Sequence, residues 1–187
     1  MRRIILSIVL MLATLPFLSA QNSYFRLQPD GTFLTTDNAK YIVKEFPNTP
    51  RVELFNKLLV NISALFISPQ DVISSVPNEM ISINAYADNV PFLTVPSAMG
   101  KVSFAPGTHY VIKVYVKDNK VRIDAPIITG IGKAGQVEFT YWIDQYKLYK
   151  KGEKNPKHLD VFDSFHNHFD SLIASILREN TAVEEDW

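Results

Sequence analysis

The chain has 187 residues, of which 19 are Lys or Arg and 19 are Asp or Glu, so its formal charge at pH 7 is zero. It has no cysteine, which excludes disulfides, thiolate metal sites and a cysteine nucleophile. A hydrophobic fraction of 47% with 20% charged residues is typical of a packed globular protein and not of a disordered one.

Residues 1–20 have the pattern of a secretory signal peptide. Arg2 and Arg3 precede an apolar run over residues 4–17, and a small residue, Ala20, marks the expected cleavage site. As a helix this run would rise only about 21 Å, short of the roughly 30 Å hydrocarbon core, so it does not predict a transmembrane anchor. We therefore expect an exported bacterial protein, located in the periplasm, at the cell surface or outside the cell.

The mature chain, residues 21–187, has the length of a single domain, and no later stretch is apolar enough to predict a membrane span. Removal of Arg2 and Arg3 leaves 17 basic against 19 acidic groups, a net charge of −2. Nucleic-acid binding needs clustered Lys and Arg, so a mildly acidic exported chain is not expected to bind DNA or RNA. Residues 184–186 form a short acidic tail that we expect to be solvated.

The first elements of the mature chain are predicted to be β-strands. Residues 24–35 alternate around Gln28-Pro29-Asp30-Gly31, where proline presets a turn and glycine takes the positive φ, so a β-hairpin is expected. Residues 41–46 are rich in strand-forming side chains and end at Pro47.

From Thr49 the apolar residues recur at three and four, which predicts an amphipathic helix with Pro50 at its first position. Its expected buried stripe is Val52, Phe55, Leu58, Leu59, Ile62, Leu65 and Phe66. Pro69 ends this helix, and the residues up to Asn78 are expected to be irregular. Residues 80–87 and 101–104 then predict strands, separated by a proline-containing loop.

Residues 109–126 carry the clearest local pattern, two alternating runs joined by Asp118 and Asn119. A primed two-residue turn there predicts an antiparallel hairpin. Its expected pairs are Lys117/Lys120, Val116/Val121, Tyr115/Arg122, Val114/Ile123, Lys113/Asp124 and Ile112/Ala125. One face would then be wholly apolar, and the other, with Tyr115 and Arg122, would be a solvated or ligand-facing surface.

The last third of the chain predicts a strand, a loop and a helix. Residues 137–143 alternate and are rich in β-formers, and residues 147–157, which are charged and contain glycine and proline, are expected to form the most mobile loop. From Leu159 to about Arg178 an apolar stripe predicts an amphipathic helix that covers a sheet. The stripe consists of Phe162, Phe165, Phe169, Leu172, Ile173 and Ile176.

This order of elements predicts an α+β fold, and over residues 24–180 the chain resembles a known family. Its most specific piece, residues 110–122, is similar to the strand, Lys-Asp-Gly-Lys turn and Arg-ended strand of a secreted family of gut bacteria, domain of unknown function 4468. Asn119 stands where that pattern usually has glycine, and asparagine also tolerates left-handed turn geometry. The resemblance implies a curved antiparallel sheet with two helices on one face, in the order β-α-β-β-β-β-α, like that of TATA-box-binding protein. It implies no catalytic residues, because that family's function is itself unknown.

Gly130, Gly132 and Gly135 satisfy the GxGxxG spacing of dinucleotide-binding loops. Such a site needs a helix whose N-terminus meets the pyrophosphate, whereas residues 137–143 are predicted to be a strand. We therefore interpret the glycines as a connection between two strands, and the sequence predicts no cofactor.

The C-terminal helix presents polar residues that a metal ion could use. His166 and His168 lie about 160° apart around the helix axis and cannot converge on one ion. Asp163, His166 and Asp170, at spacings of three and four residues, share one stripe and are the better candidate. A solvated helix surface is the more common outcome of such a pattern.

Aromatic side chains concentrate beside three lysines in residues 139–151. Trp142, Tyr146 and Tyr149 are candidates for stacking on a sugar ring or anchoring a partner protein. The alternative is a structural role, in which the odd-numbered residues of 139–143 face the core and only Trp142 and the later tyrosines are partly exposed.

No catalytic motif stands out in the sequence. We expect a non-catalytic exported module that binds an envelope protein, a glycan or a small ligand through the polar sheet face with Tyr115 and Arg122, or through the aromatic segment. One alternative is a hydrolase of glycan or peptide with sequence-dispersed residues, which would show as a pocket with convergent carboxylates or histidines. Another is an inhibitor, or a carrier that encloses an apolar ligand between sheet and helices.

Overall fold

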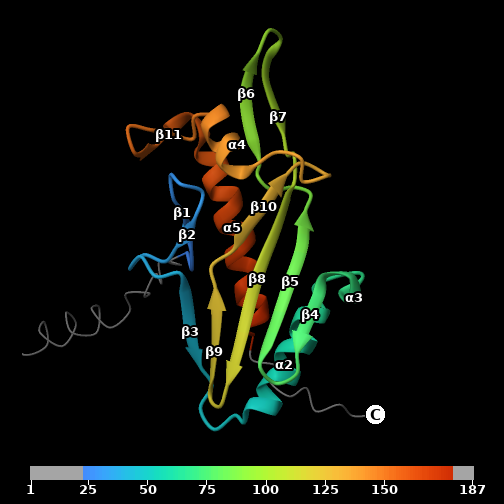
Figure 1. Ribbon diagram of the computed structural model, residues 1–187. Coiled ribbons are helices and arrows are strands. Elements are labelled where there is room, and N and C mark those ends of the chain that lie inside the picture. Colours follow the sequence, from blue (N-terminus) through green and yellow to red (C-terminus); the bar gives the residue numbers. More distant parts are fainter. Residues whose placement is uncertain (1–22, 179–187) are drawn as a thin grey trace, which may run out of the picture.

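The computed structural model describes residues 23–178, so the predicted signal peptide and the acidic tail lie outside the described residues. Six antiparallel strands form the main sheet (Figure 1). They follow the order β3 (Tyr41–Glu45), β9 (Lys120–Asp124), β8 (Thr108–Lys117), β5 (Met80–Ala87) and β4 (Ile73–Val76), and β10 (Ile127–Ile131) also pairs with β8.

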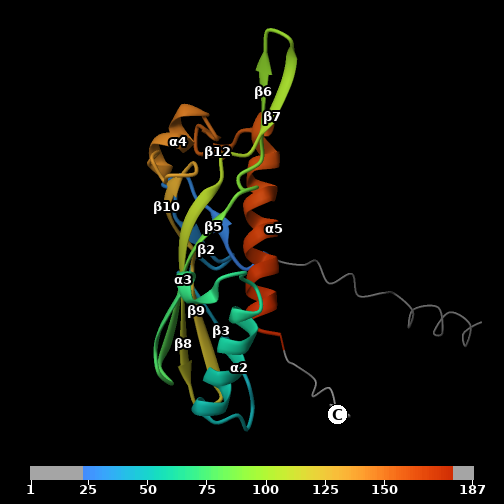
Figure 2. The same cartoon turned by 90° about the vertical axis from the view of Figure 1, so that its right-hand side faces the viewer.

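Two helices, α2 (Arg51–Ser63) and α5 (Leu159–Ile176), pack on the same face of this sheet (Figure 2). Every residue of the stripe predicted for α5 is buried. The sheet contributes a matching set of fully buried side chains, which are Ile81, Ile83, Ile112, Val114, Val121 and Ile123. The structure therefore confirms the expected α+β fold, an antiparallel sheet with two helices on one face.

Three small hairpins lie outside the main sheet, and the third, β11 (Tyr149–Lys150) with β12 (Glu153–Lys154), belongs to the C-terminal third of the chain. β1 (Arg26–Leu27) and β2 (Phe33–Leu34) form the hairpin predicted around Gly31. β6 (Leu93–Ser97) and β7 (Gly100–Phe104) form a second hairpin that projects beyond the end of the sheet (Figure 1). The sequence predicted a loop in place of β6 because it contains Pro96. Both strands of an isolated pair are edges, where a missing N–H is tolerated, so the proline can lie in a strand.

The start of α2 differs from the prediction by one residue. Pro50 is the N-cap, and Arg51 is the first helical residue. The buried stripe is also rotated, because Val52 is 53% exposed whereas Leu54 is fully buried. Asn61 occupies a buried position of this stripe, and its Nδ2 donates to the carbonyl oxygen of Ile176 at 3.0 Å.

The register of β8 and β9 is confirmed from the Lys117/Lys120 pair to the Val114/Ile123 pair. The two outermost predicted pairs do not form. β9 ends at Asp124, and β10 continues one residue out of step, with Ile127 opposite Val111. The cause is Pro126, which has no N–H to donate to the ladder. The turn is also not of the primed type I′, since Asn119 has a positive φ (62°) and Asp118 does not.

The predicted strand at residues 137–143 is wrong, because most of this segment forms helix α4 (Phe139–Gln145). Only Val137 keeps β geometry, as a bridge to Ile131. The α4 side chains that are buried are Phe139, Trp142 and Ile143. The Phe139 ring packs against Phe33 and Phe165, and this packing overrides the β-propensity of the segment.

Residues 147–157, predicted as a mobile loop, contain β11 (Tyr149–Lys150), β12 (Glu153–Lys154) and a 3-10 turn (Pro156–His158). Leu148 is fully buried and anchors this segment to the core. Lys147 and Lys151 adopt positive φ angles of 51° and 53°, which close the turns. A single apolar anchor in a charged segment gives no periodic signal, so the sequence did not show these elements.

The segment after α2 also contains a short helix, α3 (Pro69–Val72), and β4, which were expected to be irregular. Ser74 and Ser75 give β4 little strand character in the sequence, and its pairing with β5 supplies the order. Within residues 23–178, no helix is long and apolar enough to span a membrane.

Candidate binding site

Arg122 lies on the outer face of the sheet, the face opposite α2 and α5, on the strand next to the edge strand β3. Its position on β9 places it directly opposite Tyr115 on β8 and Val43 on β3. The guanidinium carbon lies 4.6 Å from the centre of the Tyr41 ring and 5.0 Å from the centre of the Tyr115 ring. Two aromatic rings thus contact one cation, in a geometry that favours cation–π attraction.

Asp124 orients the same guanidinium. Arg122 Nε donates to Asp124 Oδ1 at 2.7 Å, and this hydrogen bond is the main reason that the pKa of Arg122 is raised. Within residues 23–178 this is the one side-chain hydrogen bond of Arg122, so its terminal amino groups remain available to donate to a ligand.

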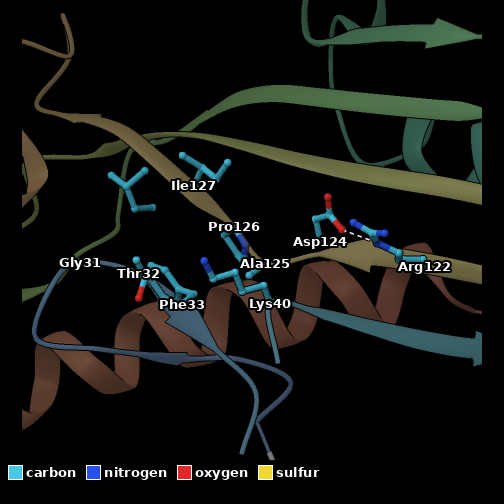
Figure 3. Close-up of a pocket in the computed structure, with 10 residues that line it drawn as sticks. Gly31, Thr32, Phe33, Lys40, Arg122, Asp124, Ala125, Pro126 and Ile127 are labelled. Atoms are coloured by element: carbon cyan, nitrogen blue, oxygen red, sulfur yellow. Dashed lines mark hydrogen bonds and ion pairs between the residues drawn. The ribbon is translucent and has the colours of Figure 1, made fainter. Parts of the chain in front are cut away.

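A cavity of about 400 Å³ begins at this cluster and extends toward the β1–β2 hairpin (Figure 3). One wall is the hairpin tip, and the other is the bend between β9 and β10. Its lining residues are Gly31, Thr32, Phe33, Lys40, Arg122, Asp124, Ala125, Pro126, Ile127 and Ile128. Lys40 extends between the two walls, and Arg122 with Asp124 lies at one end (Figure 3).

The hairpin tip that forms one wall is fixed by local hydrogen bonds. Asp30 accepts from the hydroxyl and the backbone N–H of Thr32, and the hydroxyl bond is the main cause of the lowered pKa of Asp30. Gly31 has a φ of 81°, as the predicted turn required. The wall is therefore a defined surface and not a loose loop.

The cavity combines an apolar lining with a positive charge. Lys40 and Arg122 supply two cations against the single carboxylate of Asp124. Pro126 and Ile127 supply apolar surface, and Ile127 is 58% exposed, an unusual position for isoleucine. This arrangement can bind a molecule that carries a carboxylate, phosphate or sulfonate next to an apolar group.

Of the predicted site residues, the structure brings Tyr115 and Arg122 together. Sequence reasoning missed Tyr41 and Lys40, which reach the site because β3 pairs with β9 far along the chain. The alternation of residues 41–46 was visible, but no sequence signal said which strand they would join.

The predicted aromatic segment does not form an exposed site. Trp142 is only 3% exposed, which corrects the expectation that it would be partly exposed. It is buried because α4 is a helix, which turns Tyr141 outward in its place. Tyr146 is half-buried against Trp142 and Phe104.

Tyr149, the third aromatic candidate, has a structural role. Its hydroxyl donates to the carbonyl oxygen of Leu27, and its ring meets that of Phe162 edge-on. Burial raises the pKa of this hydroxyl above its ordinary value. Tyr149 therefore ties the β11 segment to the N-terminal hairpin.

Asp163, His166 and Asp170 lie along α5 as predicted, but Asp170 accepts the backbone N–H of Tyr24 at 2.8 Å. Within residues 23–178, no three Asp, Glu or His side chains are grouped as metal ligands would be. The buried Nε2 atoms of His166 and His168 have no hydrogen-bond partner there. Burial lowers the pKa of both histidines, so both favour the neutral form.

The GxGxxG segment begins at Gly130 within β10, and helix α4 comes after it where the sequence predicted a strand. However, β10 pairs antiparallel with β8, unlike the parallel unit of dinucleotide-binding folds. A Cβ at Gly130 would lie 2.6 Å from the carbonyl oxygen of Gly135, so this glycine permits close contact between backbones. The glycines therefore serve a tight connection.

The sequence matches no family profile and no curated protein. In structure it is similar to a DUF4468 family protein from Bacteroides ovatus ATCC 8483, with a TM-score of 0.50 and 13% identity over 81% of this chain and 90% of that chain. A TBP-like protein from Parabacteroides distasonis ATCC 8503 also matches, with a TM-score of 0.40 and 16% identity over 73% of this chain and 90% of that chain. The first match shows a shared fold, as the sequence resemblance implied.

Proposed function

We propose that this chain is an exported, non-catalytic binding module of the bacterial envelope, and that it binds an anionic, partly apolar ligand in the cavity beside Arg122. The observation that carries the proposal is the guanidinium between the Tyr41 and Tyr115 rings at one end of that cavity. A side chain held in place before binding loses little conformational entropy when a ligand arrives.

The charge of the cavity supports an anionic ligand. Lys40 makes no ion pair within residues 23–178, and Arg122 keeps its terminal amino groups free of protein acceptors there. An apolar part of the ligand would contact Pro126 and Ile127, which line the same cavity. A ligand with both parts would use the whole cavity, whereas an inorganic ion would use only one end.

The hydrolase alternative has less support. General acid–base hydrolysis of a glycan uses two carboxyl groups that face one substrate. Each of four surface cavities formed by residues 23–178 is lined by at most one carboxylate, and two of them are also lined by a single histidine, His158 in one and His168 in the other. In the cavity beside Arg122, that carboxylate is already paired with the guanidinium.

A fluorescence titration with anilinonaphthalene sulfonate, an apolar anion, tests the proposed site. We expect saturable binding that Lys40→Gln weakens roughly threefold to tenfold, the effect of losing one partly exposed ionic contact. Lys113→Gln, which removes an exposed lysine of the same sheet face outside the cavity, is the control and should bind as the wild type does. Equal binding by all three proteins would contradict the proposal.

Export is tested separately by expression of the full chain and of residues 21–187. The pattern of residues 1–20 supports removal of a signal peptide. We expect the full chain to reach the periplasm with Gln21 as its new N-terminus, as measured by intact mass. Retention of the uncleaved chain in the cytoplasm would contradict export.

A further inference from the structure

β3 lies at one edge of the main sheet, and within residues 23–178 no strand pairs with its outer side. Ala125 N donates to Lys40 O at 2.9 Å, and Phe46 N donates to Asn119 O at 2.8 Å. Hydrogen-bonded pairs alternate along an antiparallel ladder, so Ile42 and Lys44 also bond to β9. The N–H and C=O groups of Tyr41, Val43 and Glu45 therefore point away from the sheet.

A groove of about 500 Å³ runs beside this edge, between β3 and the C-terminal end of α5. It lies on the helix side of the sheet and is separate from the cavity beside Arg122. Its lining residues are Tyr24, Ile42, Val43, Lys44, Ala174 and Leu177. The lining is thus apolar except for one cation, Lys44.

The edge lacks most of the features that keep other chains away. Exposed edges are commonly blocked by proline, by a bulge, by extreme shortness or by charged side chains, and of these β3 has only the last, at Lys44 and Glu45. β3 pairs with β9 over five residues in continuous register, and it contains no proline. Val43 at its centre is 52% exposed. The edge is therefore able to accept another strand.

We propose that β3 accepts an extended peptide of a partner protein as an added strand, with apolar side chains in the groove and an acidic side chain beside Lys44. The outward backbone groups recur at every second residue, a spacing of about 6.8 Å that a polypeptide strand matches. Backbone pairing supplies affinity in this mode of recognition, and pockets for alternate side chains supply specificity. The single lysine of the groove selects the acidic residue.

The probe is a synthetic peptide, Thr-Val-Thr-Val-Thr-Asp-Thr, with blocked ends. We expect it to protect the amide protons of Tyr41, Val43 and Glu45 from hydrogen exchange, as measured by NMR, while Ile42 and Lys44 are already protected. Two further peptides carry N-methyl groups on alternate backbone nitrogens, one on the odd-numbered and one on the even-numbered residues. Methylation of the set that faces β3 should abolish binding, and methylation of the other set should leave it unchanged. Binding that survives both methylation patterns, or no binding at all, would overturn the proposal.

Three variants of the protein test the same edge. Val43→Pro removes an outward N–H but no bond to β9, and we expect a loss of peptide affinity of about tenfold or more. Val43→Ala keeps that N–H and loses only groove-lining side-chain atoms, so its loss of affinity should be clearly smaller. Lys44→Glu should favour a peptide with lysine in place of aspartate. Unchanged affinity in Val43→Pro, with its fold verified by circular dichroism, would overturn the proposal. A concentration-dependent dimer that Val43→Pro removes would show that a second copy is the occupant instead.

Discussion

The Asp118 carboxylate accepts a hydrogen bond from the backbone N–H of Arg51 at 2.9 Å, so the turn between β8 and β9 caps the first turn of α2. The helix makes no side-chain cap of its own, because its N-cap residue is Pro50. Asn119, the next residue of the turn, accepts from the N–H of Thr49 at 3.0 Å. Helix start and hairpin turn therefore form one unit.

Asp118→Ala removes the cap of α2. We expect the free energy of unfolding to fall by about 1 kcal/mol, the usual effect of losing such a cap. Urea denaturation measures the change. Asp88→Ala, at an exposed aspartate of another turn, is the control, and an equal loss in both variants would show that the Arg51 contact contributes nothing.

Asn119 combines a positive φ of 62° with the hydrogen bond to Thr49. Asn119→Gly should cost about 1 kcal/mol, because it loses the bond but tolerates the backbone angle. Asn119→Ala should cost roughly 1 kcal/mol more, because alanine is strained at positive φ. Thermal or urea unfolding of both variants measures the difference. Equal stability of the two would mean that the turn changes its conformation.

The register of the β8–β9 hairpin could be predicted from the sequence, but the reason for asparagine in its turn could not. The register from Lys117 to Ile123 was predictable because alternation has a period of two, and a slip by one residue would bury charges. The use of asparagine in place of glycine was not explicable from local sequence. Its reason is the bond to Thr49, which lies far away along the chain.

The strand predicted at residues 137–143 was wrong for a related reason, because contacts from distant parts of the chain decide the structure of α4. Phe139, Tyr141 and Ile143 alternate as a strand would, but a helical spacing that includes Trp142 fits the same residues. Short apolar segments do not distinguish the two periods. The aromatic rings of Phe33 and Phe165 contact Phe139 from other parts of the chain, and this packing favours the helix over the strand.

Substitutions in α4 separate the two interpretations. Trp142→Ala should lower the free energy of unfolding by about 3–5 kcal/mol, as truncation of a buried tryptophan does. Tyr141→Ala should change it by less than about 0.5 kcal/mol, because this side chain is 63% exposed. Urea denaturation gives both values. The reverse order would indicate strand geometry at these residues.

His166 and His168 make stability depend on pH. Burial lowers their pKa below the ordinary 6.5, so at mildly acidic pH the unfolded chain binds more protons than the folded chain does. Above pH 6.5 both histidines are neutral in the folded and the unfolded chain, so they do not affect the free energy of unfolding. As the pH falls below 6.5, the unfolded chain is protonated first, and the folded chain loses stability. We expect the free energy of unfolding to decrease from about pH 7 to about pH 5.5, and less steeply in His166→Gln/His168→Gln. An identical slope in the variant would contradict this.

Part of the candidate site, the pair of Tyr115 and Arg122, was predictable from the sequence, and the rest was not. Tyr115 and Arg122 face each other in a local hairpin, so their pairing followed from register. Tyr41 and Lys40 join them only through the pairing of β3 with β9, and the cavity wall comes from the N-terminal hairpin. Such long-range contacts depend on topology, which alternation alone does not specify.

The central claim is that the outer sheet face binds an apolar anion between the β1–β2 hairpin and the β9–β10 bend. Amide NMR of isotope-labelled residues 21–187, titrated with anilinonaphthalene sulfonate, tests it most directly. The claim predicts saturable shifts confined to the amides around Lys40, Asp124 and Ile127, and their loss in Arg122→Gln/Lys40→Gln. Shifts that map instead to α5 or that spread evenly over the chain would contradict it.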